Sequence, residues 1–384
     1  MKSKRSSRIN GFHKRSLKER LEEISLWVDS NEVSGLQTGA VKTDVADKMI
    51  ENAVGFFEMP LGVATNFLIN GTDVLVPMAI EEPSVIAAAS NAARMARSGG
   101  GFLAEADSAD MIAQIELITP IKGAAAAILD ASEEIIEMAN RTQPELVALG
   151  GGVVDLTVRE KNVGEDRIVV HLVVNCLDAM GANMVNTMAE AISSRLGELA
   201  LARVGLRILT NLADRRLVRA KCNVPLKALE RNDLSGEVVA NGIVAASEFA
   251  AADSYRAATN NKGIFNGMDA VLLSTGNDWR AVEAGGHAYA ARDGRYRSLT
   301  EWTINKDALS GRLELPMAVG IVGGASKVHP TARRCINLLG VDSAAELAQV
   351  VASVGLASNL AALAALAGEG IQAGHMRLHR RRLS

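Results

Sequence analysis

Apolar and polar positions follow both helical and strand-like periods in the N-terminal part of the chain. Apolar residues spaced among charges from Leu17 to Val28 predict a surface helix. The stretch Phe67 to Ile80 contains Asn70-Gly71, a dipeptide typical of hairpin turns, and is predicted to form two strands around it. A helix is predicted to begin near Pro83, because proline and a carboxylate favour a first turn, and to stop at the glycines 99–101.

Strands and helices then alternate between residues 109 and 212. Strands are predicted at Met111–Ile118, Val153–Arg159, Arg167–Cys176 and Gly205–Leu209, and helices at Ala124–Asn140 and Met184–Ala202. This order predicts an α+β fold class, with a small α+β domain at 109–212 inserted into a large helix-rich domain made of residues 1–108 and 213–374.

Glycine and proline mark the predicted loops. Two glycines and a proline break the apolar run 51–64, which predicts a buried loop with a positional task. Within the helix-rich remainder, glycine-containing loops are predicted at 263–267, 276–294 and 320–324.

Composition narrows the class of protein. The 384 residues are 48% hydrophobic and carry a net charge of −3, which predicts a globular chain and argues against a general nucleic-acid binder. An aromatic fraction of 3% argues against stacking platforms for bases or sugars. Composition therefore predicts a globular protein with no nucleic-acid partner.

The sequence also bears on where the protein works. The basic first twenty residues lack an apolar core, so no secretory signal is predicted; a solvated basic arm near an anionic ligand is preferred, and a transit peptide is the alternative. The alanine-rich stretch Val350–Ala367 predicts a helix packed inside protein and not a membrane span. Cys176, Cys222 and Cys335 are predicted to be buried structural thiols in a reducing compartment, the cytoplasm.

One stretch suits an anionic ligand. A predicted strand runs into Asp178-Ala179-Met180-Gly181-Ala182-Asn183, after which a helix begins. Free backbone N–H groups at a helix start favour a pyrophosphate, although the glycine fingerprint of a Rossmann site is missing. On these residues alone, an ordinary helix start is the preferred interpretation and the pyrophosphate site is the alternative.

Three other positions could carry acid–base chemistry. Lys262 lies in a stretch of Asn and Gly residues, where its charge could stabilise an oxyanion, and Asp278 could pair with it. Glu82 is followed by Pro83 and preceded by a like-charged neighbour that would raise its pKa. Solvated turn residues and a solvated helix start are the alternatives. His375 and His379 have a metal-like spacing without a third ligand, so no metal site is predicted.

Six segments follow one another along the chain: Glu51-Asn52-x-x-Gly55 with Pro60-Leu61-Gly62-Val63-Ala64, Glu81-Glu82-Pro83-Ser84, Asp178 to Asn183, Asn261-Lys262-Gly263, Gly276-Asn277-Asp278 and Gly374-His375-Met376. In this order they together resemble the hydroxymethylglutaryl-CoA reductase family, in its soluble bacterial class, class II.

The resemblance implies an oxidoreductase that interconverts hydroxymethylglutaryl-CoA and mevalonate through two hydride transfers. It implies that Lys262 polarises the carbonyl, that Asp278 sits against Lys262, that Glu82 moves the proton and that His375 protonates the CoA thiolate. It further implies a ferredoxin-like, non-Rossmann dinucleotide domain. Positions that match those holding the hydroxymethylglutaryl group are Ser84, Asn211, Arg256 and Asn266, and positions that match the dinucleotide turn are Asp178, Ala179, Met180, Gly181, Ala182 and Asn183.

Cofactor and assembly also follow from the resemblance. It implies CoA as co-substrate and NAD as cofactor; Thr142-Gln143 after Asn140-Arg141 leaves NADP open, because an acid expected there in NAD-preferring relatives is missing. It implies an obligate homodimer with the active site at the interface, and residues 375–384 as the start of a mobile C-terminal flap. A flap-less homologue that only binds CoA thioester or dinucleotide is the alternative.

Overall fold

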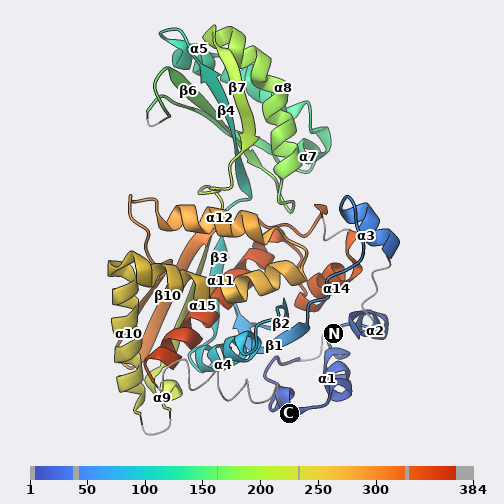
Figure 1. Ribbon diagram of the computed structural model, residues 1–384, viewed down its shortest axis with the longest axis vertical. Coiled ribbons are helices and arrows are strands. Elements are labelled where there is room, and N and C mark those ends of the chain that lie inside the picture. The colour runs from blue at the N-terminus through green and yellow to red at the C-terminus, as the bar shows by residue number, and fades with distance from the viewer. Residues whose placement is uncertain (1–4, 38–42, 162, 232–233, 325–327, 369–384) are drawn as a thin grey trace.

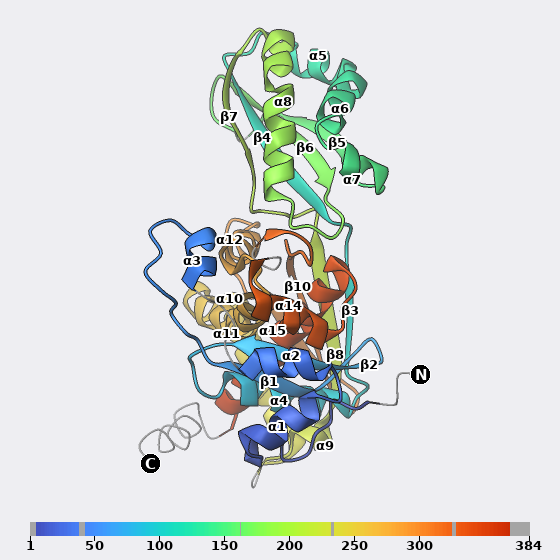
Figure 2. The same ribbon diagram turned by 90° about the vertical axis from the view of Figure 1, so that its right-hand side faces the viewer.

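The computed structural model describes residues 5–37, 43–161, 163–231, 234–324 and 328–368. They form two bodies, one above the other along the long axis, as both views show (Figure 1 and Figure 2). The upper, smaller body holds residues 110–209 and has a hydrophobic core of its own, and the lower body holds the remaining elements around a second core.

The large body is built on a six-stranded sheet with the order β2-β1-β3-β8-β10-β9. All neighbouring pairs are antiparallel except β1 and β3, which meet in parallel. The strands are β1 (Leu61–Ile69), β2 (Thr72–Ala79), β3 (Phe102–Ala106), β8 (Leu217–Pro225), β9 (Thr300–Asn305) and β10 (Ala308–Pro316).

Helix α15 (Ala344–Leu366) lies in the middle of the large body and packs against α4, α10 and α11 and against the sheet. It is long and apolar enough to cross a membrane, but 89% of its most apolar window is buried inside the protein, as the small-residue composition predicts. The other helices of this body are α1 (Leu17–Ile24), α2 (Ser30–Gln37), α3 (Thr43–Met49), α4 (Val85–Arg97), α9 (Leu226–Leu229), α10 (Gly236–Ala252), α11 (Ser254–Ser274), α12 (Trp279–Ala290) and α14 (Pro330–Leu339), with a 3-10 turn at Phe12–Lys14.

The small body has ferredoxin-like topology. Its elements run β4 (Asp110–Ile118), α5 (Ala124–Asp130), α6 (Ser132–Asn140), α7 (Pro144–Ala148), β5 (Gly152–Arg159), β6 (Arg167–Asn175), α8 (Ala182–Ala200) and β7 (Arg203–Leu209). The sheet order β5-β6-β4-β7 is fully antiparallel, which a parallel Rossmann sheet is not. The predicted fold class is confirmed; within this stretch a break at Ala131 divides the predicted helix 124–140, and the short helix α7 was not predicted.

Local sequence chemistry accounts for the best-predicted elements. Asn70 and Gly71 both have positive φ, 49° and 78°, as a tight hairpin turn with right-handed twist requires. The predicted stop at residues 99–101 is also correct, because α4 ends at Arg97 and the glycines 100 and 101 adopt positive φ. Ser16 and Glu19 form a reciprocal capping box at the start of α1.

Three predictions about the large body are wrong. Strands β8, β9 and β10 lie in the stretch 213–374, which was expected to be helix-rich. The glycine-containing stretches 263–267 and 276–294 lie mostly inside α11 and α12. Their glycines allow close packing: a Cβ on Gly267 would lie 2.1 Å from Ser358 Oγ of α15. Residues 51–60 form a loop, but Val54 and Phe57 are 100% and 91% exposed in the single chain, not buried.

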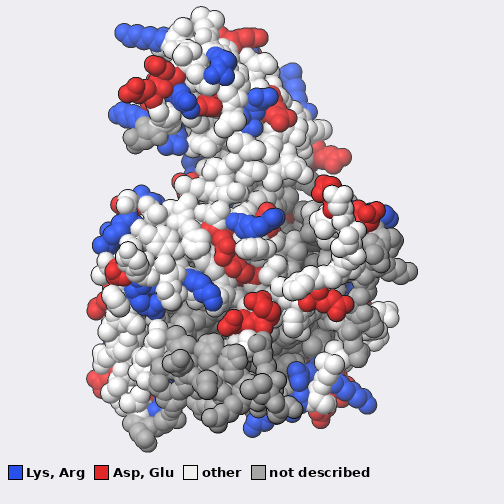
Figure 3. Space-filling model, in the orientation of Figure 1, with Lys and Arg blue, Asp and Glu red and all other residues white. Residues whose placement is uncertain are grey.

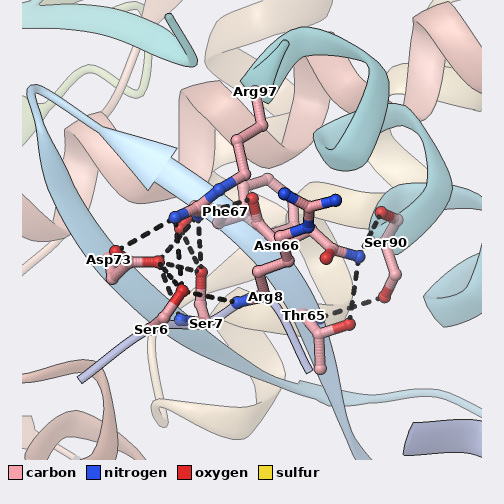
Figure 4. Close-up of polar contacts among 9 residues, drawn as sticks. All are labelled: Ser6, Ser7, Arg8, Thr65, Asn66, Phe67, Asp73, Ser90 and Arg97. Atoms are coloured by element: carbon pink, nitrogen blue, oxygen red, sulfur yellow. Dashed lines mark hydrogen bonds and ion pairs between the residues drawn. The ribbon is translucent and has the colours of Figure 1, made fainter. Parts of the chain in front are cut away.

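The described start of the chain is fixed to the fold and is not a solvated arm. Ser7 is fully buried, and its hydroxyl oxygen lies within hydrogen-bonding distance of Phe67 O, at 2.6 Å, and of Asp73 Oδ1, at 2.7 Å (Figure 4). Arg97 of α4 donates to both carboxylate oxygens of Asp73, at 2.7 and 3.1 Å. One charged pair therefore joins the chain start, the β1–β2 hairpin and α4.

Candidate active site

A cavity of about 780 Å³ opens between the start of α4, one face of α11 and the C-terminal half of α15. The predicted site residues Glu82, Ser84, Arg256, Lys262 and Asn266 all line it. The α15 wall combines the polar Ser358 and Asn359 with small alanines and Leu366. The structure thus brings together an acid, a lysine, an arginine and two neutral polar groups from segments that are distant in sequence.

Helix α11 presents its polar residues to the cavity through its period. Arg256, Thr259, Gly263 and Asn266 are spaced by three or four residues and therefore share a face, with Lys262 beside them. Asp253 fixes the start of the helix, since its Oδ1 accepts a hydrogen bond from Arg256 N at 2.7 Å. A polar turn around Lys262 was predicted; the helix gives the same residue a more rigid support.

Ser84 lines the cavity and has a strained backbone conformation. It precedes α4 with φ 81° and ψ −24°, a left-handed conformation that is uncommon for serine, and its side chain forms no cap to the helix. Such strain concentrates at functional sites, where the surrounding structure holds it. Glu82 lies two residues earlier on the same exposed turn and lines the cavity.

A buried amide network holds α11 in place and was not predicted. Asn359 of α15 donates to Asn260 Oδ1 at 2.9 Å and accepts from the indole of Trp302 at 2.7 Å. Asn261 donates to Arg297 O at 2.8 Å and accepts from Leu299 N at 3.0 Å. Asn260 and Asn359 also line the cavity. Two consecutive Asn residues beside apolar positions were the available sequence signal, because buried amides need several partners.

The predicted pair of Lys262 and Asp278 is not formed in this chain. Lys262 is exposed and, within the described ranges, makes no ion pair. Asp278 lies outside the cavity and caps α12, where its Oδ1 accepts from Ala281 N and from Arg280 Nε, each at 3.2 Å. Asn211 also lies outside the cavity, with its carbonyl against Gly285 of α12.

Partial burial affects the charged groups near the cavity differently. Burial lowers the pKa of Arg256, which nevertheless keeps its charge because an arginine pKa starts far above neutral. Further along α11, outside the residues that line the cavity, burial raises the pKa of Asp269 to about 8, helped by the charge of Glu283 and by a hydrogen bond with it. Figure 3 shows acidic side chains gathered over the region of α11 and α12, within a surface that otherwise mixes both signs.

The predicted dinucleotide turn connects β6 to the N-terminus of α8. Gly181 ends the turn with φ 99°, and a Cβ there would lie 2.3 Å from Cys176 Sγ, so both conformation and space require glycine. No side chain caps α8, and its first N–H groups are left for another acceptor, as an anion would be. Asp178 directs one carboxylate oxygen to Ala344 N at the start of α15, at 2.8 Å.

Asn140 and Arg141 lie at the same end of the small sheet as this turn. Asn140 Oδ1 accepts from Val153 N at 2.9 Å, and the neighbouring Gly152 pairs with Asn175, which ends β6 just before the turn. Arg141 is 70% exposed and pairs with Glu137 on the surface of α6.

The cysteines and the metal-binding residue types are the remaining groups that the sequence singled out. All three cysteines are buried, as predicted, and burial raises the pKa of Cys176 to about 11. Within the ranges that the structure describes, no three His, Cys, Asp or Glu residues are placed to hold a metal ion. His375, His379 and the predicted flap segment 375–384 lie outside the described residues.

Fold and cavity together define an α+β protein with an inserted ferredoxin-like body and a cavity equipped for acid–base chemistry on an anionic ligand. A profile of the family described as hydroxymethylglutaryl-coenzyme A reductase matches residues 16–380. The chain is 50% identical to the 3-hydroxy-3-methylglutaryl-coenzyme A reductase of Archaeoglobus fulgidus, over 99% of this chain and 87% of that protein. It is 32% identical to a probable reductase of the same name from Borreliella burgdorferi, over 96% and 84% of the two chains.

Solved structures agree with the sequence comparison. The class II 3-hydroxy-3-methylglutaryl-CoA reductase of Streptococcus pneumoniae, bound to NADPH in open conformations, superposes with a TM-score of 0.90 at 43% identity, over 93% of this chain and 99% of that one. A second structure of that enzyme gives a TM-score of 0.92 over 97% and 90%. The chain belongs to the hydroxymethylglutaryl-CoA reductase family of NAD(P)-dependent oxidoreductases, and the predicted family, fold class and enzyme class are confirmed.

Proposed function

We propose that this chain interconverts hydroxymethylglutaryl-CoA and mevalonate plus CoA by two hydride transfers, in the synthesis or the degradation of mevalonate. The observation that carries this proposal is the single cavity lined by Glu82, Ser84, Arg256, Lys262 and Asn266 in a chain of this family. Glu82, Ser84 and Lys262 belong to the motifs, Arg256 and Asn266 match family positions that hold the substrate, and separate segments of the fold bring all five together.

The residues suggest how the cavity acts on substrate. The dinucleotide supplies the hydride for each of the two reductions. Lys262 stabilises the negative charge that develops on the thioester oxygen, and later the charge on the aldehyde oxygen of mevaldehyde. Glu82 supplies the proton to that oxygen in reduction and takes it back in the reverse direction. Arg256 attracts the substrate carboxylate, since a guanidinium binds a carboxylate with two parallel hydrogen bonds.

Further roles rest on the family resemblance. Ser84 and Asn266 hold the hydroxymethylglutaryl group, and Asn211 contributes to the same group. Asp278 acts on the charge of Lys262, which requires the loop before α12 to approach α11 more closely than it does in this chain. His375 protonates the CoA thiolate when the thioester carbon–sulfur bond breaks.

The dinucleotide is proposed to bind at Asp178, Ala179, Met180, Gly181, Ala182 and Asn183. The unsatisfied N-terminus of α8 supports this placement, because it offers N–H donors and a positive dipole end to the pyrophosphate. NAD is the predicted cofactor, and two observations favour use of NADP as well. The S. pneumoniae relative is bound to NADPH, and exposed Arg141 lies at the same sheet end without a strong partner to hold it.

The domain assignment follows the two bodies. Residues 109–212 form the proposed dinucleotide domain, and residues 1–108 with 213–374 form the proposed domain for substrate, CoA and dimerisation. Two separate hydrophobic cores support this division, because each body can bury apolar side chains by itself.

A homodimer that completes the active site is proposed for the working enzyme. Val54 and Phe57 are almost fully exposed in the loop that follows α3, and Tyr255, beside cavity residue Arg256, is 89% exposed. Large apolar side chains exposed together mark interaction surfaces, and these lie on the motif-bearing loop and near the cavity. The cytoplasm is the proposed location, in keeping with three free buried thiols and no disulfide among the described residues.

The direct test mixes the purified 384-residue chain with mevalonate, CoA and either NAD or NADP and follows the absorbance of the reduced nicotinamide. The proposal expects a signal with at least one cofactor, and the ratio of kcat/KM values gives the preference. Silence with both, from a folded protein that still binds CoA thioester or dinucleotide in calorimetry, would establish the binding-only alternative instead.

A further inference from the structure

Arg216 is a buried cation at the junction of the two bodies. It lies in the segment that returns from β7 to β8 and is only 4% exposed. Asp110 and Asp178 favour its charge at a distance, but among the described residues no carboxylate forms an ion pair with it. Burying a guanidinium without such a pair is expensive, so a long apolar residue would serve a purely structural role at lower cost.

The guanidinium of Arg216 donates its hydrogen bonds to backbone carbonyl oxygens. Nη1 donates to Ala179 O at 3.2 Å and to Met180 O at 3.3 Å, both in the dinucleotide turn. Nη2 donates to Val319 O at 2.6 Å, in the segment that follows β10. One side chain thus joins the turn of the small body to a segment of the large body.

These contacts orient the peptide groups of the turn. All peptide bonds of the described chain are trans, so the N–H of each peptide unit points away from its carbonyl. Carbonyls of Ala179 and Met180 directed to Arg216 therefore direct the N–H groups of Met180 and Gly181 away from it. A cation beneath the turn also adds positive potential to the N-terminus of α8, where the pyrophosphate is proposed to bind.

The segment 317–322, to which Arg216 is bonded, also contacts the Asn277–Asp278 loop that precedes α12. Ile321 N donates to Asp178 O at 2.9 Å, and a Cβ on Gly320 would lie 2.6 Å from Met180 N, so the segment packs directly on the turn. Gly320 N donates in turn to Asn277 Oδ1 at 2.8 Å, next to Asp278. The turn, the segment 317–322 and the loop before α12 are therefore one connected structure with Arg216 at its base.

We propose that Arg216 is a positioning residue for hydride transfer: it orients the Asp178–Asn183 turn for the dinucleotide and fixes that turn relative to the Asn277–Asp278 loop. The inference rests on the proposed function of the turn. Arg216 belongs to none of the sequence motifs and does not itself line the substrate cavity.

The test compares Arg216→Met with Arg215→Met. The control changes the neighbouring arginine, which is half exposed and, among the residues that the structure describes, forms its one ion pair with Asp155 on the surface. Calorimetric Kd values are measured for NAD, NADP and hydroxymethylglutaryl-CoA on each variant, together with Tm and steady-state KM and kcat. We expect Arg216→Met to raise the dinucleotide Kd by about tenfold or more, since it loses two charge-assisted hydrogen bonds to the turn and a third to the segment after β10. The Kd for hydroxymethylglutaryl-CoA should change little, and Arg215→Met should match the wild type in every measurement.

Arg216→Lys gives a second and milder measurement, because it keeps the charge and cannot reach all three carbonyls. Arg216→Lys should raise the dinucleotide Kd less than Arg216→Met does. If Arg216→Met does not fold, the dinucleotide Kd of Arg216→Lys alone tests the proposal. An unchanged dinucleotide Kd in Arg216→Lys and in any folded Arg216→Met, or equal losses for dinucleotide and for hydroxymethylglutaryl-CoA, would overturn the proposal. Failure of the wild type to bind any dinucleotide would instead overturn the proposed function of the turn.

Discussion

Glu82 and Lys262 line the same cavity, although one lies just before α4 and the other in the middle of α11. Both side chains are exposed to solvent in the single chain, and neither is neutralised by an ion pair within the described ranges. An acid and a cation in one cavity can divide the work on a carbonyl: the cation stabilises the oxyanion and the acid moves the proton.

Lys262→Ala tests the first of these roles. Loss of the cation should lower kcat for reduction of hydroxymethylglutaryl-CoA by about a hundredfold to a thousandfold, the range found when one oxyanion donor is removed. The fold should persist, because Lys262 is exposed. Lys227→Ala, an exposed lysine of α9 outside the cavity, is the matched control and should retain normal turnover. Turnover close to wild type in Lys262→Ala would remove the lysine from the mechanism.

Glu82→Gln and Glu81→Gln separate two adjacent carboxylates. Glu82 lines the cavity and Glu81 does not. Glu82→Gln should slow both reductive steps by about a hundredfold or more, as expected for loss of a general acid, whereas Glu81→Gln should leave kcat within about twofold of the wild type. Rates are measured with hydroxymethylglutaryl-CoA and with supplied mevaldehyde. The opposite ranking of the two variants would transfer the acid role to Glu81.

Gly181→Ala should disrupt the dinucleotide turn. The new Cβ would meet Cys176 Sγ, and alanine also disfavours φ 99°. Gly294→Ala is the matched control, because its φ is 83° but nothing lies within 4 Å of the new Cβ. Both variants should lose about 1 kcal/mol of stability from the backbone conformation, and only Gly181→Ala should lose dinucleotide affinity in calorimetry. Normal affinity in Gly181→Ala would argue against the turn as the binding site.

Asp73→Asn tests the anchor of the chain start. Burial disfavours the charge of Asp73, but hydrogen bonds from Arg97 and Ser7 outweigh it and lower the carboxyl pKa. At pH 7 the variant should lose about 2–4 kcal/mol of stability, because Arg97 remains partly buried without its carboxylate.

That loss should depend on pH. A lowered pKa stabilises the fold above the unfolded value of 3.8 and ceases to do so as the pH falls through the folded value. The Tm difference between wild type and Asp73→Asn should therefore shrink below about pH 4. Glu137→Gln, in an exposed pair on α6, should change stability by less than about 0.5 kcal/mol. A Tm difference independent of pH would contradict the role assigned to the charge.

Asp269→Asn should have the opposite pH dependence. The pKa of Asp269 is raised from 3.8 to about 8, so between these values the folded protein keeps a proton that the unfolded chain releases. Stability therefore falls as the pH rises toward 8, and an uncharged Asn removes this loss. Relative to wild type, Asp269→Asn should gain on the order of 2 kcal/mol between pH 5 and pH 8. Asp307→Asn, at an exposed turn, should show no such trend in thermal unfolding; a flat difference for Asp269→Asn would contradict the raised pKa.

The small body was predictable almost element by element, whereas the large body was not. The strands and helices of residues 110–209 are short, local units whose alternation and glycine breaks are visible in the sequence. In the large body, the Gly-rich stretch after Lys262 and the stretch that contains Gly285 were expected to be loops. Their glycines are needed because α15, Asn211 and Phe265 approach the helix backbones closely. From the sequence alone, a glycine required by a turn cannot be distinguished from one required by close packing of a neighbouring segment.

The sequence by itself determined the hairpin at Asn70-Gly71 and the ferredoxin-like order of the small body, because both depend on local residue chemistry. It also determined the family and the identity of the candidate acid and lysine, because these follow from the order of the motifs. Only the tertiary structure decided that Glu82 and Lys262 share a cavity, that Asp278 caps α12 at a distance from Lys262, and that Arg216 is buried beneath the dinucleotide turn. These relationships depend on packing between distant segments, where burial and hydrogen-bond partners are set by the whole fold and not by neighbouring residues.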